Sequence, residues 1–281
     1  MRNNLVGELC AEFIGTMIII LFGTAVVAQV VTTAGTKAPA GGHDAITWAW
    51  GIGVTLGIYA AARLSGAHLN PAVTLALAAF KGFEWRRVAP YMLAQLVGAF
   101  AGALVVRFTY TDLIKSIDPK HTIASQVIFS TLPGNGAYQV SVTNAFFDQV
   151  VGTAILVFVV FALTTANNNP PLSNIGPVVI GLLVVGIGMA WGVNAGYAIN
   201  PARDLGPRLA SLITGYSTAL RDQNGYLYFW VPIVGPLVGG LVGGGLFKML
   251  IETHLPKDPT EEYGDPTVSE PEHDVAHDRL A

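Results

Sequence analysis

The chain has 281 residues, of which 52% are hydrophobic and only 12% are charged. A soluble domain carries roughly 25% charged residues, so this composition argues against a soluble enzyme or binding module and indicates that lipid is the main solvent. The segment after Pro256 carries eight acids and two bases, so the formal net charge of −3 reflects this segment and not a substrate. No basic stripe indicates nucleic-acid binding. The single cysteine, Cys10, excludes an intrachain disulfide and a cysteine-based metal site.

Six apolar segments are long enough to cross a bilayer, which takes about 20 residues of helix. They cover residues 9–31, 45–64, 88–108, 146–165, 175–193 and 226–250. A polar loop with prolines and glycines is expected between residues 110 and 141. The segment 256–281 is rich in proline and acids, which predicts a disordered acidic tail.

Two further apolar stretches, residues 71–80 and 201–214, are too short to span. A ten-residue helix is about 15 Å long, half of the roughly 30 Å hydrocarbon core. Each stretch is therefore predicted to enter the membrane and stop midway. Two such half-helices meeting end to end would complete one further crossing.

The sequence repeats internally. SGAHLNPA at 65–72 corresponds to NAGYAINPA at 194–202, and EFIGT at 12–16 corresponds to QVVGT at 149–153. Each half of a channel domain over 1–255, about 1–110 and 141–255, then holds three spans with a short segment after the second. Because three is odd, the second half enters the membrane upside down. An inverted repeat with broken helices places a solute site near the membrane midplane.

The distribution of basic residues predicts the orientation. With the N-terminus in the cytoplasm, Lys and Arg are slightly more numerous on the inner face, as the positive-inside rule requires. Arg86 and Arg87 contribute most to this bias. We therefore expect both termini, and the acidic tail, on the cytoplasmic side.

The most informative motifs are the two Asn-Pro-Ala triplets that begin at Asn70 and Asn200. Asn is a strong N-cap and Pro is favoured at the first helical position, so each triplet predicts the start of a half-helix. A capping Asn accepts through its side-chain oxygen, which leaves its NH2 group as a donor only. The positive ends of both helix dipoles would point to this spot. A passing water must turn its oxygen toward the two amides, which interrupts a proton wire and repels cations.

With these motifs the chain resembles the major intrinsic protein (aquaporin) family, and within it the glycerol facilitator or aquaglyceroporin branch. The similarity is carried by SGAHLNPAVT at 65–74 and GYAINPARD at 196–204, and it covers about residues 8–256. It implies an all-α membrane fold with six transmembrane helices and two re-entrant half-helices. It also implies a homotetramer with one pore in each subunit.

The resemblance implies a selectivity filter of four residues: Trp50, Gly188, Tyr197 and Arg203. Trp50 and Tyr197 would form an apolar corner for the CH groups of a polyol, and Arg203 would donate to its hydroxyls. Gly188 would leave room because it has no side chain. Trp50 is preferred to Trp48 because its spacing from Asn70 matches the family pattern. For the two aromatic residues, an interfacial aromatic belt remains an alternative.

Further roles also follow from the resemblance. Backbone carbonyls before each Asn are expected to form a ladder for solute hydroxyls, and non-helical backbone is tolerated at this depth only where it lines a wet cavity. The ladder residues are Gly66, Ala67, His68, Gly196, Tyr197 and Ala198. Glu12 and Gln149 are expected to brace the re-entrant loops, although a functional acid at position 12 stays open. Asp204 is a supporting residue typical of the polyol branch, and a buried ion pair between it and Arg203 is the alternative role for the arginine.

The predicted function is a channel for facilitated diffusion of glycerol and other small uncharged solutes, such as water and urea, that excludes ions and protons. A water-selective aquaporin is the alternative, and an ion-coupled secondary transporter is a more distant one because Glu12 alone is poor support for ion coupling. The histidines form no nucleophile–base or metal constellation, so we expect neither an enzyme nor a cofactor. The expected location is the plasma (inner) membrane, with several passes.

Overall fold

We analysed a computed structural model that describes residues 5–256. The predicted acidic tail, 256–281, falls outside the described residues except for Pro256. The named elements of the described part are all helices, and six of them are long and apolar enough to cross a membrane. The predicted all-α membrane fold is therefore confirmed.

The six spans follow the predicted segments closely. They are α1 (Leu5–Thr33), α2 (His43–Ser65), α4 (Trp85–Thr109), α7 (Val142–Thr164), α8 (Gly176–Ala195) and α10 (Val231–Leu250). The largest difference is at α10, which begins five residues after the predicted start at Tyr226. Aromatic residues at 226–230 make the loop before α10 as apolar as a span, which placed the predicted start too early. The structure begins the helix beside Pro232, where a fixed φ and a missing N–H suit the first turn.

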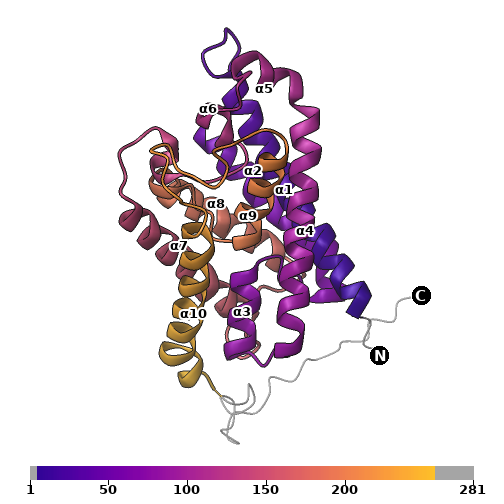
Figure 1. Cartoon of the computed structure of the whole chain (residues 1–281). Helices are drawn as coiled ribbons and strands as arrows, with labels where there is room; N and C mark the ends of the chain where they lie inside the picture. The colour runs from indigo at the N-terminus through magenta and orange to yellow at the C-terminus, as the bar shows by residue number, and fades with distance from the viewer. Residues whose placement is uncertain (1–4, 257–281) are drawn as a thin grey trace, which may run out of the picture.

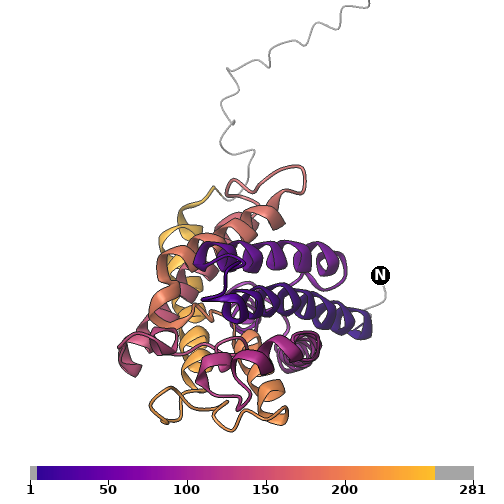
Figure 2. The same ribbon diagram turned by 90° about the horizontal axis from the view of Figure 1, so that it is seen from above.

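The two predicted half-helices are α3 (Pro71–Phe80) and α9 (Pro201–Ile213). Their N-terminal ends meet inside the bundle, and from there the two helices run toward opposite ends of the molecule (Figure 1). Seen from above, most of the first half of the chain lies on one side of the bundle and most of the second half on the other (Figure 2). Each half-helix packs against a span of the other half: α3 packs against α10, and α9 packs against α4.

Close contacts between helices depend on glycine, and they repeat in the two halves. A Cβ at Gly98 on α4 would lie 2.2 Å from the carbonyl oxygen of Phe13 on α1. A Cβ at Gly243 on α10 would lie 2.1 Å from the carbonyl oxygen of Ala154 on α7. The backbones are therefore in direct contact, as small residues allow in membrane helices.

The segment between the halves differs from the expected polar loop. It folds into α5 (Thr111–Ile117), α6 (Ile123–Gln126) and the 3-10 turn η1 (Pro133–Gly136). Phe129 and Leu132 are almost fully buried in it, and so is the polar side chain of Gln126. These buried side chains hold the segment against one end of the bundle, where it covers the pore entrance described below. A second short 3-10 turn, η2 (Glu252–His254), follows α10.

Replacement of Gly243 by alanine should destabilise the fold, because the new methyl group would overlap the backbone of α7. Overpacking of this kind costs about 1–3 kcal/mol. Gly245→Ala is the matched control, since a Cβ there would lie 3.5 Å from the Phe80 ring in ordinary contact. The measurement is the fraction of detergent-solubilised protein that elutes as a monodisperse species after heating. Equal loss in both variants would contradict the proposed close contact.

Candidate pore and its constriction

The two Asn-Pro-Ala triplets cap the half-helices in the same way. Both Asn70 and Asn200 have extended backbone, and a proline follows each at the first helical position. The Oδ1 atom of Asn70 accepts from the Ala72 N–H at 2.8 Å. The Oδ1 atom of Asn200 accepts from the Ala202 N–H at 3.0 Å. These are side-chain N-caps that satisfy otherwise unpaired donors of the first helical turn.

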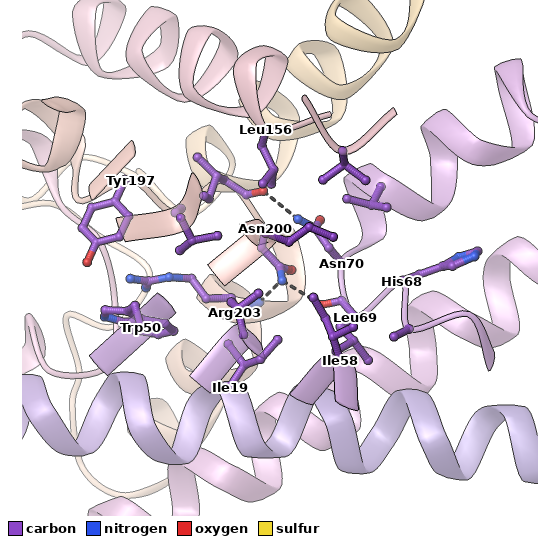
Figure 3. Close-up of a pocket in the computed structure, with 18 residues that line it drawn as sticks. Ile19, Trp50, Ile58, His68, Leu69, Asn70, Leu156, Tyr197, Asn200 and Arg203 are labelled. Carbon is purple, nitrogen blue, oxygen red and sulfur yellow. Dashed lines mark hydrogen bonds between the residues drawn. The ribbon is translucent and has the colours of Figure 1, made fainter. Parts of the chain in front are cut away.

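The NH2 groups of the two asparagines also make contacts that the sequence did not predict. The Nδ2 atom of Asn70 donates to the carbonyl oxygen of Ile199 at 2.8 Å, and that of Asn200 donates to the carbonyl oxygen of Leu69 at 2.8 Å. Both crossing bonds are visible in Figure 3. Each amide therefore uses one N–H to join the halves, and its second N–H has no partner among the described residues.

The two chain segments before the asparagines share an unusual backbone. Gly66, Ala67 and Leu69 have positive φ, and so do their counterparts in the second half, Gly196, Tyr197 and Ile199. In an extended strand successive carbonyls point to opposite sides. Left-handed residues placed before and after His68, and before and after Ala198, break this alternation and allow neighbouring carbonyls to face one side. Such backbone inside a membrane bundle is consistent with a wet pore wall.

Glu12 braces the first of these segments. Its Oε1 atom accepts from the Ser65 hydroxyl at 2.6 Å and from the His68 N–H at 2.9 Å. Its Oε2 atom accepts from the Leu69 N–H and from the Gln95 amide, each at 2.7 Å. The side chain is fully buried. Both carboxylate oxygens are thus occupied by the protein's own donors.

Gln149 holds the second segment with fewer bonds. Its Oε1 atom accepts from the Ile199 N–H at 3.0 Å, and its Nε2 atom donates to the Ala195 carbonyl at 2.8 Å. The imidazole of His68 lies away from the asparagine pair, with Nδ1 at 3.2 Å from the Thr74 hydroxyl (Figure 3). Only its backbone is therefore placed to take part in the ladder.

Two cavities meet at a narrow point in the bundle. A cavity of about 90 Å³ contains both asparagines, and a cavity of about 230 Å³ lies under the segment 127–135. Trp50, Tyr197 and Arg203 line both cavities, so they form the partition between them. Figure 3 shows the guanidinium of Arg203 between the two aromatic side chains. Three of the four predicted filter residues therefore lie at one constriction.

The constriction places a guanidinium directly beside two aromatic rings. The Cζ atom of Arg203 lies 3.8 Å from the ring centroid of Trp50 and 5.9 Å from that of Tyr197. Among residues 5–256 the structure gives the guanidinium of Arg203 no hydrogen-bond acceptor. In the same part of the chain, Trp50 Nε1 and the Tyr197 hydroxyl also lack a partner. Trp48, by contrast, is 48% exposed on the outside of α2, whereas Trp50 is 3% exposed.

Gly188 lies behind the constriction and lines neither cavity. A Cβ there would lie 2.9 Å from Cζ of Tyr197 and 2.9 Å from Cγ2 of Thr47. The space that the missing side chain leaves is thus taken by the Tyr197 ring, and not directly by solute. A side chain at position 188 would therefore have to displace the Tyr197 ring or Thr47.

Asp204 pairs with a residue that the sequence reasoning missed. It forms an ion pair with Arg208, and both side chains are fully buried. Its Oδ2 atom accepts from the Thr131 N–H at 2.8 Å and from the Thr131 hydroxyl at 2.7 Å. Arg208 also donates to the carbonyl oxygens of Thr131 and Ala219. The alternative pair between Arg203 and Asp204 is absent from the described ion pairs, so the guanidinium of Arg203 stays available to the pore.

The segment over the wide cavity has its own carboxylate anchor. Asp118 accepts from the Ser125 hydroxyl at 2.7 Å and from the Thr122 N–H at 2.6 Å. Burial acts to raise the pKa of Asp118, but these hydrogen bonds outweigh it and hold that pKa below its ordinary value. The carboxylate stabilises the segment at neutral pH, and this contribution is lost as the pH falls through the lowered pKa.

Comparisons with known proteins agree with this architecture. The sequence model of the family described as "Major intrinsic protein" matches residues 1–247. A probable aquaglyceroporin-2 from Gibberella zeae is 42% identical over 252 residues, which cover 86% of this chain and 72% of the relative. A glycerol uptake facilitator protein from Pseudomonas aeruginosa is 40% identical over 262 residues, with 90% and 91% covered. The X-ray structure of the aquaglyceroporin from Plasmodium falciparum superimposes with a TM-score of 0.78 at 32% identity, covering 88% of this chain and 97% of that one.

Replacement of Asp204 by asparagine should strongly destabilise the protein, because Arg208 would be left as a buried charge without its counter-ion. Removal of one partner of a buried pair costs about 3–5 kcal/mol. Glu84→Gln is the control, since Glu84 pairs with Arg86 at the surface and should matter little. Thermal unfolding in detergent, followed by loss of the monodisperse elution peak, measures both variants. An Asp204→Asn variant as heat-resistant as the parent would refute the anchoring role.

Proposed function

The chain belongs to the major intrinsic protein family, and from this premise we propose that it is a transmembrane channel for glycerol and other small uncharged solutes, together with water. The observation that carries the proposal is the constriction at which Trp50, Tyr197 and Arg203 separate two cavities. Two aromatic rings beside a guanidinium that has no hydrogen-bond acceptor among the described residues suit a solute that carries both CH groups and hydroxyls. Solute flow is then passive and follows its gradient.

The asparagine pair provides a second control point. Each amide NH2 has one N–H left to donate to a solute oxygen, and both helix dipoles present their positive ends there. A water that accepts from both amides has its hydrogens turned away, which interrupts a proton wire. Arg203 adds a fixed positive charge at the constriction, an electrostatic barrier of the kind that excludes cations and protons from water channels.

The carbonyl ladder completes the proposed path. Solute hydroxyls would donate to backbone oxygens of Gly66, Ala67 and His68 on one side of the asparagines, and of Gly196, Tyr197 and Ala198 on the other. The positive φ values in both segments support this role, because they break the alternation of an extended strand and allow neighbouring carbonyls to face one side. Glu12 and Gln149 would hold the two segments in place, and Asp204 would hold α9 against the connecting segment.

The structure gives reasons to prefer this function to its alternatives. An ion-coupled transporter needs a titratable or ion-binding group that faces the path, whereas both oxygens of Glu12 are occupied by four donors of the protein. Relatives named aquaglyceroporin and glycerol uptake facilitator favour a polyol channel over a water-selective one. The proposal includes no enzymatic step and no cofactor.

Location and assembly belong to the proposal as well. The chain is a multi-pass membrane protein. We place it in the plasma (inner) membrane, and the distribution of its basic residues favours both termini in the cytoplasm. We further propose a homotetramer with one pore per subunit and an acidic tail, 256–281, on the cytoplasmic side, as the family resemblance implies.

Proteoliposomes containing the purified protein should equilibrate glycerol much faster than empty liposomes. The measurement is light scattering in a stopped-flow instrument after a glycerol gradient is imposed, with urea and larger polyols for comparison. The rate should be independent of proton and sodium gradients because the flow is passive. A glycerol rate equal to that of empty liposomes would contradict the channel, and a rate that follows an ion gradient would favour a transporter.

Gly188→His should reduce glycerol flux much more than water flux. The imidazole would occupy the space of the Tyr197 ring and push that ring into the path. We expect the glycerol rate to fall about tenfold or more, the range typical of one changed group in a specificity pocket. Both permeabilities are measured on the same vesicles, after monodisperse elution has confirmed folding. An unchanged glycerol-to-water ratio would remove Gly188 from the filter.

A further inference from the structure

One face of α2 carries three residues in a row, His43, Thr47 and Trp50, at the spacing of side chains that share a helix side. Trp50 belongs to the constriction and lines both cavities, whereas His43 lines the wide cavity. His43 is the first residue of α2 and is half-buried. The row packs along α8, with which α2 is in extensive contact. His43 therefore lies at the end of this helix contact that faces the wide cavity.

The part of α8 opposite this row has glycine at positions 188 and 192. A Cβ at Gly192 would lie 2.5 Å from Cε1 of His43 and 3.2 Å from Cδ1 of Tyr197. The edge of the imidazole and the Tyr197 ring thus share the space that the missing side chain leaves. One turn earlier, Thr47 and Tyr197 share the space over Gly188 in the same way. Two side chains of α2 therefore lie beside the Tyr197 ring where it rests on α8.

A hydrogen bond between the two helices fixes the orientation of His43. Its Nε2 atom lies 3.0 Å from the carbonyl oxygen of Gly188. A carbonyl can only accept, so Nε2 carries a hydrogen and donates it. Among residues 5–256 the imidazole has no other hydrogen-bond partner. This single bond therefore keeps the ring over Gly192, and without it the side chain is free to turn into the wide cavity.

The position of the Tyr197 ring affects which solutes pass, because Tyr197 forms the partition between the cavities together with Trp50 and Arg203. Space that opens beside a packed side chain lets that side chain relax into it. We propose that His43 is a positioning residue for solute selection. Its bond to the Gly188 carbonyl holds the imidazole over Gly192, and the imidazole keeps the Tyr197 ring in the constriction. This inference rests on the proposed polyol channel and adds the residue that sets its size limit.

The test measures the size limit with erythritol, which is one carbon longer than glycerol. Stopped-flow light scattering on proteoliposomes gives the flux of each polyol, and the ratio of erythritol to glycerol flux is compared between proteins. His43→Ala should raise this ratio about tenfold, the range typical of one changed group in a specificity pocket. A purely structural role would lower the amount of folded channel and both fluxes together, which leaves the ratio unchanged. An unchanged ratio overturns the proposal.

Two further variants test how His43 acts. His43→Gln retains a side-chain N–H that can reach the Gly188 carbonyl, so its ratio should stay close to that of the parent. A ratio as high as in His43→Ala would show that the hydrogen bond does not hold the ring, which overturns the proposal. In the double variant with His43→Ala and Gly192→Ala, the new methyl group fills the space that the imidazole edge leaves. This variant should again exclude erythritol, and free passage of erythritol would overturn the role of that space.

The controls separate this inference from the proposed function. Asp44→Asn changes the exposed neighbour of His43 and should keep the parent ratio. Monodisperse elution in detergent checks folding, and if His43→Ala fails this check, His43→Asn replaces it, because its shorter side chain also loses the bond. If the parent passes glycerol and the ratio does not respond to His43, the inference alone is wrong. If the parent passes neither polyol, the proposed function is wrong and the inference falls with it.

Discussion

Two hydrogen bonds at the centre of the bundle join the inverted halves of this protein. Asn70 donates to the carbonyl before Asn200, and Asn200 donates to the carbonyl before Asn70. Each asparagine thereby caps its own half-helix and also donates a hydrogen bond to a carbonyl oxygen in the non-helical segment of the other half. Backbone that leaves helical geometry inside a membrane must find such partners, because no lipid group can replace them. The pore path is built around this reciprocal contact.

The unwound segments also need donors and acceptors from the spans around them, and the two halves solve this differently. In the first half the carboxylate of Glu12 accepts four hydrogen bonds, from Ser65, His68, Leu69 and Gln95. In the second half the neutral Gln149 makes two bonds, to Ile199 and Ala195. The carboxylate of Glu12 thus accepts hydrogen bonds from backbone N–H groups that would otherwise lack a partner. Neither of its oxygens is left open to an ion.

The entrance on the side of the wide cavity depends on a second buried charge network. The ion pair of Asp204 with Arg208 ties the half-helix α9 to Thr131 of the connecting segment. Because Asp204 is engaged in this way, its neighbour Arg203 keeps its guanidinium free between Trp50 and Tyr197. Adjacent residues of a helix point to different sides. Asp204 can therefore hold the structure together while Arg203 faces the cavities.

The sequence by itself determined the spans, the half-helices, the inverted repeat and the family, because each rests on a local pattern: apolar length, an Asn-Pro start, or a motif repeated at matched positions. It also predicted Trp50, Tyr197 and Arg203 as neighbours through the resemblance. Tertiary structure alone decided the contacts between distant segments. These include the crossed asparagine bonds, the Asp204–Arg208–Thr131 network, the buried connecting segment and the position of Gly188 behind Tyr197. No local pattern encodes such contacts, since they depend on which side chains packing brings together across the bundle.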